Sequence, residues 1–473
     1  MTLRIGVIAD DFTGATDIAG FLVSAGLRTV QLNAPERTPE NLDADAVVIS
    51  LKTRSIPAAE AVEQSLRACR ILQELGAERI IFKYCSTFDS TAEGNIGPVT
   101  DALLEELGED FTVVVPALPV NGRTVYRSTL FVHEQPLHES GMKDHPVTPM
   151  TDSDLIRLME AQSRGTAAPV PYEAVEEGPD AVRSALEEAR AQGARYAVVD
   201  TLNHRHLDTI GQAVTGLRLL TGGSGIGSGL ARALTGRADS ETEQSPAHDW
   251  EFTAGAAVVI SGSASQMTNR QVERYAQHAP STALDLPRVI EDPQGYLTEL
   301  AAWVLEQSPA SAAPEPADHG AAAPELADHG AAAPEFADHR AASAAPLVYA
   351  TAAPEKVRQW QQEYGAERLS AAIEDFFGKL AARLREHGVT RFIVAGGETS
   401  GAVTQALGVE GFEVGPQIAP GVPWTRSLEM DPQRRIDLTL KSGNFGDEDF
   451  FRTAVEMSGT GTGTGGPGTE EGR

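Results

Sequence analysis

Short apolar runs alternate with amphipathic stretches along the first half of the chain. Each run is bounded by polar or turn residues, which is typical of strands buried inside a sheet. The stretch 58–75 has Ala, Val, Leu and Ile at helical spacing and predicts a helix between two such runs. Strands that alternate with helices indicate βαβ units and a mostly parallel sheet. The predicted strands are LRIGVIA (3–9), DAVVISL (45–51), RIIFKY (79–84), FTVVVPAL (111–118) and YAVVD (196–200).

A second series with the same alternation begins near residue 255. The stretch 237–254 before it is polar and charged and has no apolar period, so it suits a linker. We therefore expect an α/β protein with two domains, 1–236 and 255–457, each with a mostly parallel sheet, and an active-site cleft between them. The strands predicted in the second domain are AAVVIS (256–261), PLVYA (346–350), RFIVAG (391–396) and IDLTLKSG (436–443).

Three segments depart from this alternation. RSTLFVHEQPL (127–137) predicts a β-hairpin inserted into the first domain. Residues 312–343 contain AAPEPADHG and two near copies of it, and this Ala/Pro-rich composition predicts a disordered insertion. The Gly/Thr-rich tail over 458–473 is predicted to be disordered as well. The Asp-His pairs of the repeat leave metal binding open as an alternative, although the composition favours disorder.

The charge balance narrows the choice of partners. Of 473 residues, 67 are acidic and 38 basic, which gives a formal net charge of −29. Without a basic surplus, we expect neither a nucleic-acid nor an anionic-membrane partner. No apolar run approaches the ~20 residues of a membrane helix, and the N-terminus lacks a signal-peptide pattern. The two cysteines, Cys69 and Cys85, show no metal-type spacing, so we expect a reduced, cytoplasmic protein.

Two adjacent carboxylates, Asp10 and Asp11, directly follow the first predicted strand. The carboxyl end of a strand, facing a helix N-terminus, is where an open α/β sheet usually binds its ligand. We interpret one carboxylate as a general base for a hydroxyl group and the other as a residue that orients the substrate or Mg²⁺. A structural alternative stays open, because Asp11 could instead cap the helix that begins near Gly14.

Polar side chains also follow the later strands of the first domain. Arg123 can form a bidentate pair with a carboxylate, and hydroxyl and amide side chains can orient carbinol groups. Together these residues predict a basin at the strand ends for a small anionic, hydroxylated molecule. The candidate substrate-binding residues are Lys83, Ser86, Asp89, Ser90, Arg123 and His145.

Three strand-to-helix junctions of the second domain are rich in glycine and small hydroxyl residues. Glycines let backbone N–H groups approach an anion, and a helix N-terminus adds about half a positive charge. With Lys441 in the third junction, they predict a cradle for a polyphosphate, although the chain has no P-loop motif. The junctions are VVISGSASQMTNRQV (258–272), FIVAGGETSGAV (392–403) and LTLKSGNFG (438–446).

A further glycine-rich stretch, TGGSGIGSGLA (221–231), lies at the end of the first domain. It does not fit the dinucleotide-binding fingerprint, because Leu230 takes the place of the third glycine. We interpret it as a loop that closes the first domain.

A domain that holds polyphosphate, facing one that holds a small polyol acid, suggests phosphoryl transfer. The chain resembles the four-carbon acid sugar kinases from residue 4 to about 456, apart from the repeat insertion. This resemblance implies an N-terminal domain that binds the sugar acid and a C-terminal domain that binds ATP. We expect Mg²⁺ as the second cofactor, because phosphoryl transfer needs charge neutralisation. The resemblance also implies transfer of the γ-phosphate to the terminal 4-hydroxyl of a 3-dehydro four-carbon acid. The motifs concerned are IADDFTGATDIAG, FKYCSTFDSTAEGNIGPV, PALPVNGRTVYRSTLFV, LHESGMKDHPVTPMTDS, AGGETSGAV and LKSGNFGDEDFF.

The resemblance also assigns residues to the nucleotide site. The segment KYCSTFDST within 83–91 favours the branch of the family that acts on 3-oxo acids, because relatives acting on D-threonate or D-erythronate have a Lys-Asp-Ser-Thr version. Ala264 stands where many relatives have Cys, which leaves the backbone cradle intact. The residues implied by the resemblance are Ser263, Gly396, Gly397, Glu398, Thr399 and Gly443, and Ser261 and Lys441 of the same junctions are further nucleotide-binding candidates.

Two alternatives remain at this stage. Within the family, the chain could be a kinase of unoxidised D-threonate or D-erythronate. Outside enzymes, it could be a catalytically silent regulator that binds a sugar acid, but the acidic pair is present and no DNA-binding module is evident. The sequence leaves open the stereochemistry at C2 of the substrate, the identity of the base, the metal ligands and the oligomeric state, for which a homodimer is one candidate.

Overall fold

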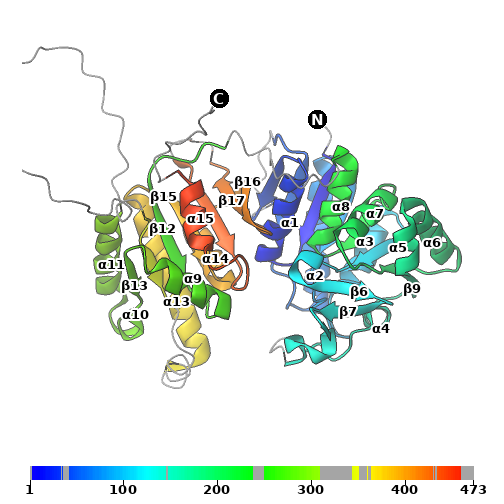
Figure 1. Cartoon of the computed structure of the whole chain (residues 1–473), viewed down its shortest axis with the longest axis horizontal. Helices are drawn as coiled ribbons and strands as arrows, with labels where there is room; N and C mark the ends of the chain where they lie inside the picture. The colour runs from blue at the N-terminus through cyan, green and yellow to red at the C-terminus, as the bar shows by residue number, and fades with distance from the viewer. Residues whose placement is uncertain are drawn as a thin grey trace, which may run out of the picture.

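The chain folds into two α/β lobes that lie side by side (Figure 1). The computed structural model describes residues 3–33, 35, 42–144, 148–237, 250–308, 344–350, 360, 364–429, 431 and 434–459. The predicted repeat insertion, most of the predicted linker and the tail beyond residue 459 lie outside these residues. In the described part of the chain, no helix is both long and apolar enough to cross a membrane.

The N-terminal lobe alternates strands and helices. Its main elements are β1 (Ile5–Ala9), α1 (Phe12–Ser24), β2 (Thr29–Leu32), β3 (Ala46–Ser50), α2 (Ala58–Glu74), β4 (Arg79–Lys83), α3 (Ile96–Leu107), β5 (Thr112–Val115), α4 (Leu155–Gln162), β9 (Ala167–Val170), α5 (Tyr172–Glu177), α6 (Pro179–Ala191), β10 (Tyr196–Val199), α7 (His204–Ala213), β11 (Leu219–Gly222) and α8 (Ser224–Thr235). A small antiparallel sheet contains β6 (Arg123–Tyr126), β7 (Thr129–Val132) and β8 (Gln135–Pro136).

The C-terminal lobe repeats the alternation and ends with antiparallel strands. Its elements are β12 (Ala256–Ser261), α9 (Gln266–Tyr275), β13 (Ser281–Ala283), α10 (Leu286–Glu291), α11 (Pro293–Gln307), β14 (Leu347–Tyr349), α13 (Ala366–Glu386), β15 (Val389–Ala395), α14 (Gly397–Ala406), β16 (Gly411–Ala419), β17 (Val422–Ser427), β18 (Asp437–Lys441) and α15 (Phe450–Met457). All the predicted strands are confirmed, with ends shifted by a few residues, and the stretch 58–75 forms α2.

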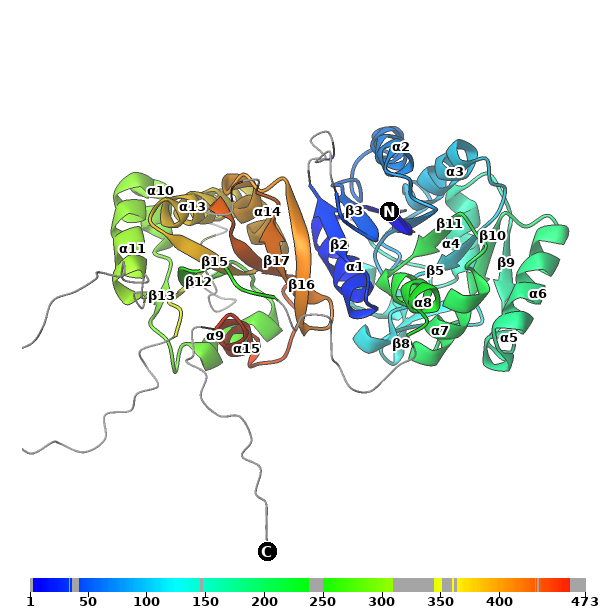
Figure 2. The ribbon, with the colours of Figure 1, turned by 90° about the horizontal axis from the view of Figure 1, so that it is seen from above.

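One continuous sheet of fifteen strands runs through both lobes of the described chain (Figure 2). Its order is β13-β14-β12-β15-β18-β17-β16-β2-β3-β1-β4-β11-β5-β10-β9. Every neighbouring pair from β2 to β9 is parallel. The lobes are joined where β16 pairs antiparallel with β2, with Gly411 opposite Leu32 and Phe412 opposite Gln31. The predicted mostly parallel sheets are therefore confirmed, and a main-chain ladder joins them.

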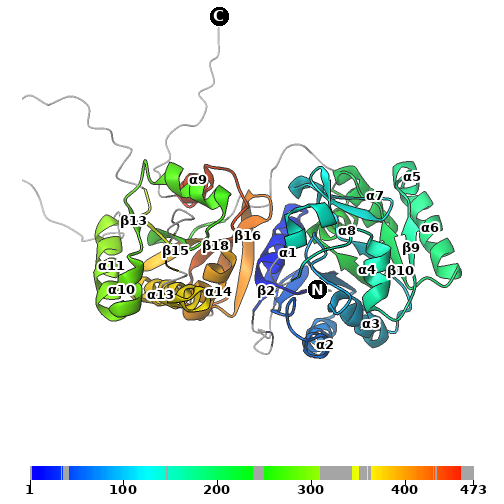
Figure 3. The same cartoon turned by 90° about the horizontal axis from the view of Figure 1, so that it is seen from below.

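Helices cover both faces of the sheet, and each lobe has a point where successive helices pack on opposite faces. From β1 the chain passes to β2 and β3 on one side and then to β4 on the other, with α1 and α2 packed on opposite faces. In the C-terminal lobe, α9 after β12 and α14 after β15 likewise pack on opposite faces. Such switch points are where open α/β sheets bind ligands, at the carboxyl ends of the strands. Figure 3 shows β2 and β16 side by side between α1 and α14, so the two switch points are close together.

The predicted hairpin over 127–137 is confirmed as an antiparallel insertion, but it begins earlier. Its first strand, β6, starts at Arg123, and a third strand, β8, ends at Pro136. Arg127 and Ser128 form the β6–β7 turn with positive φ angles of 48° and 58°, as a two-residue type I′ hairpin turn requires.

The interpretation of 221–231 as a loop is wrong, because this stretch forms the end of β11 and the first turns of α8. Its glycines serve close packing. A Cβ at Gly229 would collide with the Leu207 carbonyl oxygen of α7, and a Cβ at Gly227 would lie 2.8 Å from Ile18 Cδ1 of α1. These glycines therefore let α8 approach two helices more closely than side chains would allow.

Candidate active site

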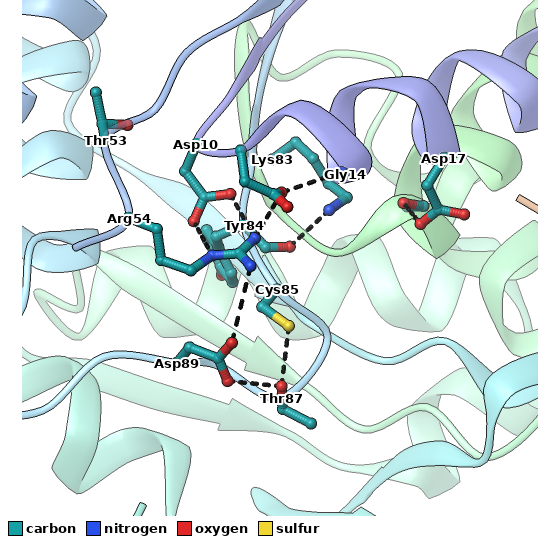
Figure 4. A network of polar contacts seen from close by, with 12 residues as sticks. Asp10, Gly14, Asp17, Thr53, Arg54, Lys83, Tyr84, Cys85, Thr87 and Asp89 are labelled. Carbon is teal, nitrogen blue, oxygen red and sulfur yellow. Dashed lines mark hydrogen bonds and ion pairs between the residues drawn. The ribbon is translucent and has the colours of Figure 1, made fainter. Parts of the chain in front are cut away.

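A single arginine holds the acidic pair at the end of β1 (Figure 4). Arg54 donates from Nε to Asp10 Oδ2 at 2.9 Å and from Nη2 to Asp10 Oδ1 at 2.8 Å. The same Nη2 donates to Asp11 Oδ1 at 2.7 Å. The backbone N–H of Gly14 also donates to Asp11 Oδ1, at 3.1 Å, which confirms that Asp11 caps α1. One guanidinium thus links both candidate catalytic carboxylates through charge-assisted hydrogen bonds.

Arg54 is a residue of this site that the sequence analysis missed. It lies in the loop after β3, where the backbone N–H groups of Thr53 and Arg54 donate to the Asp10 carbonyl at 2.9 and 3.2 Å. Asn95 Nδ2 donates to the Thr53 carbonyl at 2.6 Å, which ties the loop to the start of α3. The available signal was its place after β3, because loops that follow neighbouring parallel strands meet at one edge of the sheet.

The acidic pair lies beside further buried charges. Burial raises the pKa of Asp10, and the cation of Arg54 opposes this rise. Lys83, at the end of β4, is only 3% exposed and donates to the Tyr84 carbonyl at 3.0 Å. Asp17 of α1 accepts a hydrogen bond from Ser224 at Oδ2, while its Oδ1 is buried without a partner in the described structure. Burial raises the pKa of Asp17 to about 6, although Lys83 acts to lower it.

We expect Asp17→Asn to stabilise the protein at neutral pH. The folded-state pKa of about 6 exceeds the value of about 3.9 for an unfolded aspartate. The folded state therefore binds more protons between these values, and stability falls as pH rises through this window. The shift corresponds to about 3 kcal/mol above pH 6. Urea unfolding of both proteins at about pH 4, 6 and 8 tests this. As pH rises, only the wild type should lose the part of its free energy of unfolding that depends on Asp17. An identical pH dependence of unfolding in both proteins would contradict the prediction.

Three of the predicted substrate-binding residues, Ser86, Asp89 and Ser90, lie on the segment after β4. Asp89 Oδ1 accepts from the Thr87 hydroxyl at 2.6 Å, and Asp89 Oδ2 lies 3.9 Å from Arg54 Nη1. Ser86 is half-buried near the N-terminus of α8, where a Cβ at Gly223 would lie 3.6 Å from Ser86 Cβ. This segment therefore borders the acidic pair on the side of β4.

Ser90 lies on the same segment, but its side chain contacts α4. It is 1% exposed, and its hydroxyl donates to Gln162 Oε1 of α4 at 2.7 Å, so its contact is structural. Arg123 donates from Nη1 to the Asn121 carbonyl at 2.5 Å, and its Nε is buried without a partner in the described structure. The charge of Arg123 acts to lower the pKa of Asp17, which places it within range of the basin. His145 lies outside the described residues.

The three glycine-rich junctions of the C-terminal lobe converge. A Cβ at Gly443 would lie 2.5 Å from Ser263 Oγ, and a Cβ at Gly396 would lie 3.2 Å from the Ser263 nitrogen. Gly396 has a φ of 121° and directly precedes α14, while Ser265 caps α9 by accepting from the Thr268 N–H. The glycines thus let the main chains of the three junctions approach one another more closely than side chains would allow. A main-chain surface at helix N-termini suits a polyphosphate.

Other predicted nucleotide residues surround this surface. Gly397 and Glu398 are exposed in the first turn of α14. Thr399 is buried, and a Cβ at Gly262 would collide with its Oγ1. Ser261 is fully buried at the end of β12, and its hydroxyl has no partner in the described part of the chain.

The Lys441 side chain is buried and binds the turn of the third junction. It is 1% exposed, and its Nζ donates to Thr268 Oγ1 at 3.0 Å and to the carbonyls of Ser442 and Gly443 at 3.1 Å each. Burial lowers the pKa of Lys441 to about 7. In this structure, Lys441 therefore fixes the turn at 442–443 and does not present a free cation.

The two halves of the site face each other across the interdomain cleft. A Cβ at Gly397 would lie 3.7 Å from Thr13 Oγ1 in the first turn of α1, and a Cβ at Gly401 would lie 3.9 Å from Nζ of the exposed Lys52. A cavity of 710 Å³ between α2 and α14 extends the cleft. The acidic pair does not line this cavity, but the adjacent Phe12 does. Gly401, at the end of the second glycine-rich junction, also lines the cavity, whereas the predicted nucleotide-binding residues do not.

Comparisons with known proteins divide the chain in the same way. It matches the sugar-binding N-terminal domain family over residues 5–230 and the nucleotide-binding C-terminal domain family over 258–330 and 315–451. It is 52% identical over 459 residues to a 3-oxo-tetronate kinase of Brucella melitensis biotype 1, with 96% of each chain covered. It is 51% identical over 455 residues to a 3-oxo-tetronate kinase of Actinobacillus succinogenes, with 96% of this chain and 100% of that one covered.

Two solved structures resemble the whole chain. The first, described as a tRNA synthase from Salmonella typhimurium LT2, has a TM-score of 0.83 and 50% identity and covers 96% of this chain and 99% of that one. The second, a protein of Haemophilus influenzae, has a TM-score of 0.78 and 48% identity and covers 96% of this chain and 100% of that one. Both likenesses extend over the two lobes together.

Proposed function

Because the chain belongs to the four-carbon acid sugar kinase family, we propose that it uses ATP to phosphorylate the 4-hydroxyl of a 3-dehydrotetronate. The acceptor is 3-dehydro-D-erythronate or 3-dehydro-L-threonate, and the product is the 4-phosphate. The supporting observation is that the acidic pair at the N-terminus of α1 lies opposite the glycine-lined N-terminus of α14. A hydroxyl held by the first and a phosphate held by the second would be in position to react.

The N-terminal basin suits the sugar acid. Arg123 presents a buried Nε without a partner in the described structure, so a substrate carboxylate at this guanidinium would satisfy it. Ser86 and Asp89 border the same space and would orient the oxygen atoms of the carbon chain. One carboxylate of the acidic pair accepts the proton of the 4-hydroxyl.

The C-terminal cradle suits the phosphates of ATP. Ser263 lies just before α9, and Gly397 is exposed in the first turn of α14, where the helix dipole favours an anion. Gly443 packs beside Ser263. Gly396 shapes the turn before α14, and its own N–H donates to the Lys441 carbonyl. Across the described residues, no group of three or more His, Cys, Asp or Glu is arranged to hold a metal ion. We propose that Mg²⁺ binds together with the phosphates of ATP and neutralises charge on the transferring group.

An ATP-consumption assay with Mg²⁺ tests the substrate. We expect turnover of 3-dehydro-D-erythronate or 3-dehydro-L-threonate, generated enzymatically, and at most traces with D-threonate and D-erythronate. Turnover of the unoxidised acids alone would place the chain in the sister branch and refute the interpretation of segment 83–91. ATP binding without turnover of any of the four acids would support the silent-regulator alternative.

A further inference from the structure

The two carboxylates of the acidic pair are not equivalent in the structure. The Asp10 side chain is 7% exposed, and each of its oxygens accepts a hydrogen bond from Arg54. The Asp11 side chain is 28% exposed. Its Oδ1 accepts from Arg54 and from the Gly14 N–H, whereas no described residue donates to its Oδ2. Only Asp11 therefore presents an accessible oxygen that remains free to accept a proton.

Arg54 is placed to fix this difference. Its Nε and both hydrogens of Nη2 are directed to Asp10 and Asp11. Its Nη1 lies 3.9 Å from Asp89 Oδ2, which is too long for a hydrogen bond. The fork geometry of a guanidinium holds two carboxylates in a fixed relative orientation, which a point-like ammonium does not.

We propose that Asp11 is the general base, acting through Oδ2, and that Arg54 is the positioning residue that holds it, with Asp10 as the anchor of Arg54. This assignment rests on the proposed kinase function. The acceptor oxygen forms its bond to the γ-phosphorus while the bond from that phosphorus to the bridging oxygen breaks, and ADP leaves with the electron pair. Asp11 Oδ2 takes the hydroxyl proton and releases it to solvent.

The position of Asp11 supports this role. It caps α1 two residues before Thr13, which faces Gly397 of the nucleotide domain across the cleft. Asp10 is turned inward against the loop after β3, which its own carbonyl also binds. A proton on Asp10 would displace one of the two hydrogen bonds from Arg54, whereas a proton on Asp11 Oδ2 displaces none.

The pH dependence of kcat/KM distinguishes the two carboxylates. The charged groups around Asp11 are Asp10, Asp17, Arg54, Lys83 and Asp89, with Lys52 and Glu398 near the α14 side of the cleft. Asp11→Asn should lower kcat by about 10²–10⁴ and remove the acid limb of the profile. Asp10→Asn should keep the acid limb and move it to lower pH by about one unit, because a neighbouring negative charge is lost.

The arginine variants complete the test. Arg54→Gln should move the acid limb to higher pH by about one unit, because the base loses its cation. Arg54→Lys should restore the position of the limb but not kcat, because the charge returns without the fork. Loss of the acid limb in Asp10→Asn, with its survival in Asp11→Asn, would overturn the assignment. ADP affinity and thermal unfolding, measured on every variant, show whether each is folded.

Carbodiimide labelling of the intact protein, read by peptide mass spectrometry, is independent of turnover. We expect Asp11 to be modified and Asp10 to be protected in the wild type, and Asp10 to become reactive in Arg54→Gln. Preferential modification of Asp10 in the wild type would also overturn the assignment. If the wild type phosphorylates none of the four acids while Asp11 is selectively modified, the proposed substrate fails but the inequality of the two carboxylates stands.

Discussion

Gly396→Ala is expected to weaken ATP binding by about 10–100-fold. Gly396 has a φ of 121°, a conformation that residues with a side chain rarely adopt. A Cβ there would lie 3.1 Å from Thr399 Oγ1 and 3.2 Å from the Ser263 nitrogen. Relief of the strain, about 1–3 kcal/mol, would move the main chain at the start of α14 away from the first junction. Because the cradle consists largely of main-chain groups, this movement should appear directly as lost affinity.

Gly388→Ala is the matched control. Gly388 has a φ of 89°, so alanine imposes comparable backbone strain, but no other atom lies within 4 Å of its added Cβ. It precedes β15, whereas Gly396 follows β15, so the two lie at opposite ends of the same strand. Calorimetric titration with ATP should separate the variants even where thermal unfolding shows similar destabilisation. Equal affinity loss in both would mean that strain in the lobe, and not the cradle, controls binding.

The sequence predicted nine of the fifteen strands in the main sheet and missed six, among them β2 and β16, which join the lobes. Buried strands such as β1 and β3 appear as continuous apolar runs, and α2 has a clear helical period, so local pattern was sufficient for them. The antiparallel pairing of β2 with β16 joins positions almost four hundred residues apart. The register of such a pair depends on the side chains of both strands and cannot be predicted from either strand alone. The glycines in 221–231 suggested a loop from the sequence alone. Their role is to let α8 pack closely against α7 and α1, and this contact exists only in the folded protein.

The residues of the candidate site could be predicted from the sequence where they directly follow a strand. Asp10, Asp11 and the glycine-rich junctions were recognised because strand ends at a parallel sheet form one edge. Arg54 lies in LKTRSI, which has no motif, and its role depends on a loop fixed by Asn95 and by the Asp10 carbonyl. Ser90 and Lys441 have the residue types expected at a polar site. Their partners, Gln162 of α4 and the carbonyls after β18, turn both of them inward.

The join between the lobes should itself matter for catalysis, and Gly411→Val is expected to lower kcat by about 10²-fold. A Cβ at Gly411 would lie 2.8 Å from the Gln31 carbonyl oxygen, and this main-chain atom cannot move aside without breaking the β2–β16 ladder. The next residue, Phe412, packs edge-on against Phe12 with ring centroids 6.3 Å apart. Phe12 directly follows Asp11, so a shift of β16 would displace the proposed base relative to α14.

ATP binding provides the contrast that identifies this effect. The glycine-rich junctions lie entirely within the C-terminal lobe, so Gly411→Val should leave ATP affinity within about threefold of wild type while kcat falls. Differential scanning calorimetry should also resolve the lobes into separate transitions, because their main-chain ladder is weakened. Glu413→Ala is the control, since this exposed side chain on β16 can be removed without disturbing its pairing with Val30. A variant at Gly411 that keeps wild-type kcat would show that the shared sheet is dispensable for aligning the two halves of the site.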